Sequence, residues 1–110
     1  MKMLVDVETA LKDLDVNLSE YMEMVGDFKE YMDEYIPELQ EYVKRDNSSD
    51  LKEVAHSMEI FLAELHFFVA EDIANRLVKS AGINSQENPD LLIRELKQCL
   101  DKTLSSIGVY

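Results

Sequence analysis

Between residues 21 and 43, apolar side chains recur at every third or fourth position, a spacing that gathers them on one face of an α-helix. The positions are Tyr21, Val25, Phe28, Met32, Ile36, Leu39 and Val43. Asn17 and Glu20 precede this run at the spacing of a capping box, which predicts where the helix begins. Pro37 lacks a backbone N–H, so we expect the helix to be kinked there or broken into two nearly collinear pieces.

Other stretches of the chain repeat this helical spacing. They are Met3 to Leu14, Leu51 to Leu65, Val69 to Leu77 and Leu92 to Ile107. The buried stripe predicted for the second of these consists of Leu51, Val54, Ala55, Met58, Phe61, Leu62 and Leu65. The chain has only 3 glycines and 2 prolines, so it offers few points at which helices end.

Polar segments mark the predicted breaks between helices. "KRDNSSD" is typical of a turn, with Ser48 or Asp50 as the cap of the next helix. Gly82 is a helix stop, and "GINSQENPD" predicts a loop in which Asn88 caps a helix with Pro89 at its first position. A tight turn near residues 64–67 is left open, because an unbroken helix there would form a rod of about 30 residues, roughly 45 Å long.

No strand pattern, internal repeat or low-complexity segment competes with the helices. Amphipathic helices joined by short connections bury their apolar faces most simply by packing against one another. We therefore predict an all-α fold, in which residues 1–110 form a single domain. Its architecture is an antiparallel four-helix bundle with a short additional N-terminal helix covering one end.

The net charge, the single cysteine and the lack of long apolar runs limit the partners and the cellular setting that we expect. With 23 acidic and 11 basic residues, the formal net charge is -12, which repels nucleic acid and anionic membrane surfaces. Cys99 is the single cysteine, so an intramolecular disulfide is excluded and a reducing, cytoplasmic setting is expected. The N-terminal residues are too charged for a signal peptide, and no apolar run approaches the roughly 20 residues that span a bilayer. We expect no membrane insertion.

His56 is the candidate reactive residue. At 100° per residue it lies about 140° from Leu51 and about 160° from Met58, away from the predicted core stripe. The residues on its side of the helix are Lys52, Glu59, Ile60 and Ala63. Imidazoles ordinarily titrate near neutral pH, so an exposed histidine is a nucleophile that needs no neighbouring base, and phosphoryl transfer would suit it.

Three segments follow one another in a particular order. An acidic residue, Asp6, lies in a short first helix, a long second helix has Phe28 in its middle, and "SSDLKEVAHSMEIFLAEL" comes after a polar turn, with His56 between Ala55 and Ser57. In these features the chain resembles the histidine-containing phosphotransfer (HPt) domains of two-component phosphorelays, and His56 stands where the family's phosphoryl-accepting histidine falls. The resemblance implies a phosphoryl carrier rather than an independent enzyme.

The same resemblance implies the partners. They would be a receiver domain, a histidine kinase or both, and the HPt domain would act as a monomer. It would hold no cofactor of its own, because the receiver supplies Mg²⁺. The expected docking surface around His56 is framed by Lys52, Met58, Glu59, Ile60 and Ala63.

The chain departs from the family pattern after the histidine. Glu59 and Ile60 stand where HPt domains usually have Lys and Gly, and His66 replaces a Gly common at the turn into the next helix. A carboxylate near the imidazole would repel a phosphoryl group by roughly 1 kcal/mol in water, and the branched Ile60 would fill room that glycine leaves for a receiver. Ala63 keeps the small residue that the family favours.

Two other functions remain open. In the first, an HPt-like adaptor docks receivers or kinases through the His56 face without carrying phosphate, and Glu59 acts as a permanent charge. In the second, Glu53 and His56 form a Glu-x-x-His pair of the kind found in di-iron bundles, but residue 63, three before His66, is alanine, so a second pair is missing. We expect His66 to end a helix or to pack beside Phe67 and Phe68.

Overall fold

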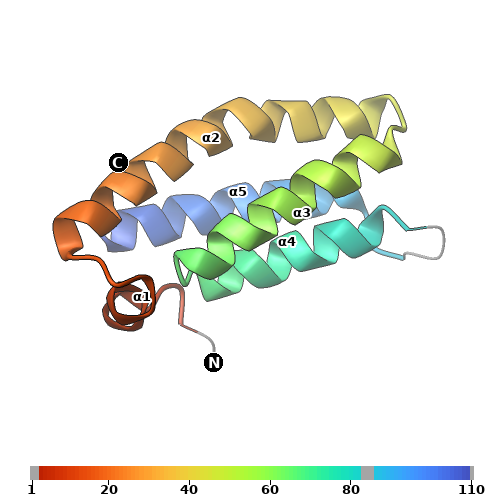
Figure 1. Cartoon of the computed structure of the whole chain (residues 1–110). Helices are drawn as coiled ribbons and strands as arrows, with labels where there is room; N and C mark the ends of the chain where they lie inside the picture. Colours follow the sequence, from red (N-terminus) through yellow and green to blue (C-terminus); the bar gives the residue numbers. More distant parts are fainter. Residues whose placement is uncertain (1–2, 83–85, 110) are drawn as a thin grey trace.

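The computed structural model describes residues 3–82 and 86–109, which form five helices. They are α1 (Val7–Leu14), α2 (Leu18–Lys44), α3 (Ser48–Glu64), α4 (Phe68–Ser80) and α5 (Pro89–Ser106). Figure 1 shows α2 to α5 as a bundle of antiparallel neighbours, with α1 lying across one end. The predicted all-α bundle with a short additional N-terminal helix is confirmed. Within the described ranges, no helix has both the length and the apolar character needed to cross a bilayer.

Side-chain caps set the beginnings of the first two helices. α1 starts after Asp6, whose carboxylate accepts hydrogen bonds from the N–H and hydroxyl of Thr9, so the helix is shorter than the predicted stretch from Met3. At α2 the predicted capping box is confirmed. The Asn17 side chain accepts from the Glu20 N–H at 2.8 Å, and the Glu20 carboxylate accepts from the Asn17 N–H at 3.2 Å.

Proline does not break the longest helix. α2 runs from Leu18 to Lys44 as one helix that contains Pro37, so the predicted division into two pieces is wrong. Pro37 lies on the exposed side of α2, and the helix continues past it although one intrahelical hydrogen bond is lost there.

The predicted connections between helices are correct except for the residue that caps the start of α3. Asn47, rather than Ser48 or Asp50, caps α3, because its side-chain oxygen accepts from the Asp50 N–H at 3.2 Å. α4 ends at Ser80, just before the predicted stop at Gly82. The predicted cap of α5 at Asn88, with Pro89 at the first helical position, is confirmed. Residues 83–85 of the predicted polar loop lie outside the described residues.

A turn at residues 65–67 separates α3 from α4, so the two helices do not form one continuous rod. His66 has a φ of 58°, in the left-handed region, and this reverses the chain direction. The turn is held from outside the two helices. The Tyr21 hydroxyl donates to the Leu65 carbonyl at 2.8 Å, and the Asp6 N–H donates to the His66 carbonyl at 3.2 Å.

The cores of α2 and α3 follow the predicted stripes with three exceptions. On α2 the predicted apolar positions from Tyr21 to Leu39 are buried, whereas Val43 is only partly buried. On α3 Leu51, Ala55, Met58, Leu62 and Leu65 are buried, whereas Val54 is only partly buried and Phe61 is 43% exposed. Phe61 lies at the edge of the stripe and packs on aromatic side chains of α2 instead of entering the core. Cys99 is buried as expected, and burial raises the pKa of its thiol.

Candidate functional site

His56 lies in the middle of α3, on the side turned away from the core. Its side chain is 61% exposed, whereas Ala55 and Met58 on the opposite side are fully buried. The helical phase predicted from the sequence is therefore confirmed at this position. The imidazole is open to a partner molecule.

Glu59 lies one turn along α3 and contacts the imidazole directly. Its Oε1 atom is 3.3 Å from Nδ1 of His56, and its Oε2 atom accepts a hydrogen bond of 2.5 Å from the side-chain amide of Asn75 on α4. The Glu59 side chain is only 19% exposed, so the carboxylate is held between the two helices. These three residues form a chain of contacts from α4 to His56, which we call the Asn75–Glu59–His56 chain.

The Asn75–Glu59–His56 chain determines which imidazole nitrogen is available. An ionised carboxylate only accepts hydrogen bonds, so a hydrogen bond to Glu59 requires the proton of a neutral imidazole to be on Nδ1. The lone pair then lies on Nε2, on the edge of the ring that faces away from the carboxylate. Sequence reasoning missed Asn75, because its amide reaches Glu59 only through the packing of α4 on α3.

The other predicted surface residues divide into two groups. Lys52, Ile60 and Ala63 are exposed on α3, and Ile60 leaves 49% of its surface open to solvent. Met58 is fully buried, so its predicted place at the edge of the docking surface is wrong. It lies about 160° around the helix from His56 and belongs to the core stripe.

His66 lies in the turn between α3 and α4 and contacts neighbouring side chains. Its Nε2 atom lies 3.1 Å from Oδ2 of Asp13 on α1, and its ring meets Phe68 edge-on at 5.3 Å. Nδ1 is buried without a hydrogen-bond partner among the residues that the structure describes. Of the two alternatives expected for His66, packing beside Phe68 is confirmed, whereas α3 itself ends at Glu64 with Leu65 as its cap. Its left-handed backbone is a conformation that glycine adopts without steric cost.

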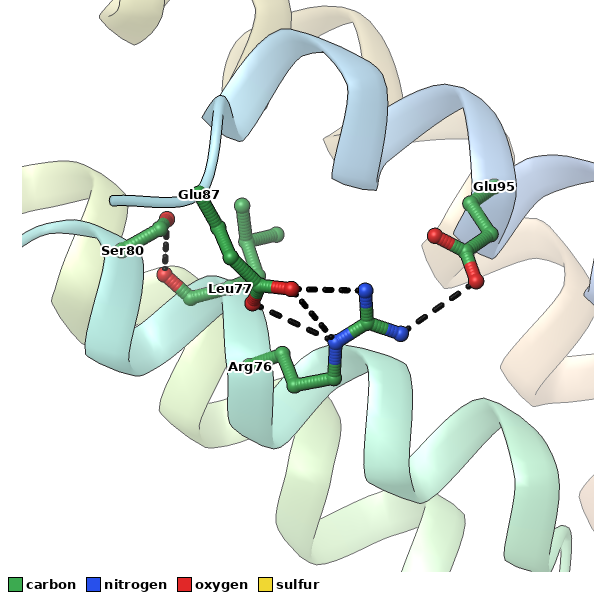
Figure 2. A network of polar contacts seen from close by, with 5 residues as sticks. All are labelled: Arg76, Leu77, Ser80, Glu87 and Glu95. Atoms are coloured by element: carbon green, nitrogen blue, oxygen red, sulfur yellow. Dashed lines mark hydrogen bonds and ion pairs between the residues drawn. The ribbon is translucent and has the colours of Figure 1, made fainter. Parts of the chain in front are cut away.

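An arginine anchors the end of the bundle beyond Asn75. Arg76 on α4 binds Glu87 at 2.8 Å and Glu95 of α5 at 3.3 Å, so one guanidinium bridges the chain before α5 and the helix itself, as Figure 2 shows. The hydrogen bond to Arg76 lowers the pKa of the Glu87 carboxyl. Nearby, the Ser80 hydroxyl donates to the Leu77 carbonyl at 2.6 Å. These contacts hold the half of α4 that carries Asn75 against α5.

The described residues offer no candidate metal centre. Across residues 3–82 and 86–109, no three His, Cys, Asp or Glu side chains are placed so that they could hold a metal ion. Glu53 and His56 therefore have no third ligand there.

Comparisons with known proteins identify no related protein. No family model matches the chain, and neither the curated proteins nor the solved structures give a significant match.

Proposed function

We propose that this protein is a histidine phosphotransfer domain in which His56 accepts a phosphoryl group from the aspartyl phosphate of a receiver domain and passes it on. The observation that supports the proposal best is the exposed imidazole whose Nδ1 faces the Glu59 carboxylate at 3.3 Å, which leaves Nε2 free to attack. A receiver domain, a histidine kinase or both are the proposed partners. The domain would act as a monomer in the cytoplasm.

The chemical step uses both nitrogens of the ring. The Nε2 lone pair forms the N–P bond while the P–O bond to the receiver's aspartate breaks, and the aspartate leaves as a carboxylate. The ring becomes positively charged and keeps its Nδ1 proton, which stays hydrogen-bonded to Glu59. Mg²⁺ held by the receiver would neutralise charge on the phosphoryl oxygens.

The role of Glu59 in this step differs from the one expected from the sequence. Proximity to His56 predicted only repulsion of the phosphoryl group. The carboxylate instead meets the edge of the ring opposite Nε2, where its charge offsets the positive charge of the phosphorylated ring. Asn75 fixes the carboxylate in that position. In this proposal Glu59 and Asn75 are positioning residues.

The direct test is transfer from a panel of phosphorylated receiver domains to the purified protein. We expect acid-labile label on the wild type and none on His56→Gln. Lack of label from receivers that phosphorylate an ordinary HPt domain would contradict the proposal. Glu59→Gln separates the two roles of the carboxylate, because slower transfer indicates orientation of the ring and faster transfer indicates repulsion.

A spectroscopic measurement tests the ring independently of transfer. The ¹⁵N chemical shifts of His56 report which nitrogen carries the proton. We expect the Nδ1–H form to predominate in the wild type and to decrease in Glu59→Ala. Equal populations of the two forms in both proteins would show that Glu59 does not orient His56.

Docking without phosphoryl transfer is the second candidate, and exposed Ile60 favours it. A branched apolar side chain, 49% exposed one turn from His56, offers contact area to a partner and adds bulk beside the nitrogen. Ile60→Asp should weaken receiver binding and leave the thermal midpoint nearly unchanged, because this side chain is outside the core. Receiver binding by the wild type without label on His56 would assign the adaptor function.

A further inference from the structure

Phe61 is an exposed aromatic residue beside a cluster of aromatic side chains. Its ring centroid lies 6.3 Å from that of Phe28 and 5.2 Å from that of Tyr31, both on α2, and Phe61 remains 43% exposed. In Figure 1, α2 and α3 are joined at one end by a short connection and diverge toward the end covered by α1. The aromatic rings lie between the two helices and leave part of their surface uncovered.

A groove of about 270 Å³ opens beside these rings, and we call it the α2–α3 groove. Its lining residues are Met24, Asp27, Phe28, Tyr31, Phe61, Glu64 and Leu65. The walls are therefore aromatic and aliphatic, and the two charged lining residues are both carboxylates. Asp27 and Glu64 are exposed, and they stand on opposite helices.

The electrostatic character of the α2–α3 groove favours a cation. Burial is the largest cause of the raised pKa of the Tyr31 hydroxyl, and the nearby Tyr35, Glu38 and Glu34 raise this pKa further. Aromatic faces attract cations through the ring quadrupole, and Asp27 and Glu64 provide full negative charges beside them. The formal net charge of -12 reinforces this preference at longer range.

We propose that the α2–α3 groove is a docking site for a basic amphipathic helix of a partner protein. An apolar side chain of that helix would enter beside Phe61, and Lys or Arg residues flanking it would pair with Asp27 and Glu64. Peptide helices commonly bind in this way, with their apolar faces in a groove between helices. The volume, below the roughly 300–1,000 Å³ of small-molecule sites, suits anchoring side chains better than a whole ligand.

This docking site is separate from the phosphotransfer face. Phe61 lies about 140° around α3 from His56, so the groove faces α2 while the imidazole faces away from it. The proposal therefore does not depend on phosphorylation of His56. A peptide in the groove should bind equally well to the wild type and to His56→Gln.

The probe is an 18-residue amphipathic peptide of leucine and lysine, compared with a peptide of the same pattern in which glutamate replaces lysine. Binding is measured by fluorescence anisotropy and mapped by ¹H–¹⁵N spectra of the protein. We expect saturable binding of the lysine peptide alone, with the largest shifts at Phe61 and its neighbours. The double variant Asp27→Lys/Glu64→Lys and the variant Phe61→Ala should each weaken binding by at least about tenfold.

Matched controls lie on other faces of the bundle. Asp33→Lys/Asp101→Lys makes the same change in net charge at exposed residues between α2 and α5, and Leu91→Ala removes an apolar side chain that is 57% exposed. Both should retain the affinity of the wild type after allowance for net charge at 0.15 M salt. If the control and groove charge variants lose the same amount of peptide affinity, only net charge matters, and the proposal is overturned.

Other occupants give different results in the same assay. Absence of saturable lysine-peptide binding, equal binding of the glutamate peptide, or shifts outside the groove would refute the proposal. If benzyltrimethylammonium moves the same resonances with equal affinity, the groove is a site for small organic cations. Concentration-dependent dimerisation that Phe61→Ala abolishes would assign the groove to a second copy of this chain.

Discussion

Tyr21→Phe tests how the bundle holds the turn between α3 and α4. Tyr21 is fully buried, and its hydroxyl donates to the Leu65 carbonyl at 2.8 Å. The substitution deletes this donor, keeps the ring and leaves a buried carbonyl without that bond. We expect the free energy of unfolding to fall by about 1–2 kcal/mol, or roughly 4–10 °C in Tm for a chain of this size.

The same contact predicts a particular pH dependence. Burial raises the pKa of Tyr21 from 10.0 to about 12, so the folded protein keeps the phenol proton in a range where the unfolded chain loses it. The stability contributed by this group is therefore complete below pH 10 and is lost as the pH rises toward 12. By pH 11 the loss is on the order of 1 kcal/mol.

The assay is urea unfolding of both proteins between pH 8 and pH 11. The stability difference between wild type and Tyr21→Phe should shrink by about 1 kcal/mol over that range, because only the wild type carries the titrating phenol. Tyr42→Phe is the control at pH 8, since the Tyr42 hydroxyl bonds an exposed carboxylate, and its effect should stay within about 0.5 kcal/mol. A difference that does not change with pH would refute the buried position of the Tyr21 hydroxyl.

Further predictions concern caps and charges. Asp15 has a left-handed φ of 54°, so Asp15→Gly should stabilise the protein by about 0.5–1 kcal/mol in urea unfolding, and a loss of stability would contradict this geometry. Asn17→Ala removes the capping box of α2 and should lower the free energy of unfolding by about 1 kcal/mol, whereas an unchanged value would mean that the cap is redundant. Because Arg76 lowers the pKa of Glu87, the stability from this pair is present above pH 4.5 and is lost as the pH falls further. Thermal melts of Glu87→Gln should therefore show a weaker decline between pH 5 and pH 3 than the wild type, and parallel declines would count against the pairing.

Local patterns in the sequence were sufficient for the helices and for the outward face of α3. Spacings of three and four residues and the rotation of 100° per residue depend only on helical geometry, so they correctly placed His56 on the surface and Ala55 in the core. Caps were equally local, which is why Asn17 and Asn88 were correct. Asn47 was missed because Asn47, Ser48 and Asp50 are all polar residues that can cap a helix. Which of them caps α3 depends on the backbone conformation at the start of the helix.

Contacts between helices could not be predicted from local sequence patterns. Glu59 and Asn75 are 16 positions apart, and only the packing of α4 on α3 brings the amide to the carboxylate and thereby orients the His56 ring. Phe61 has the spacing of a core residue, yet it is partly exposed and packs on the rings of Phe28 and Tyr31 of α2. Periodicity reports the direction of a side chain from its own helix axis, whereas burial and hydrogen bonding depend on what the neighbouring helix places there. Helical spacing and local caps were therefore enough to predict the helices and the exposure of His56, whereas the partner of its Nδ1 atom and the shape of the α2–α3 groove depend on how the helices pack.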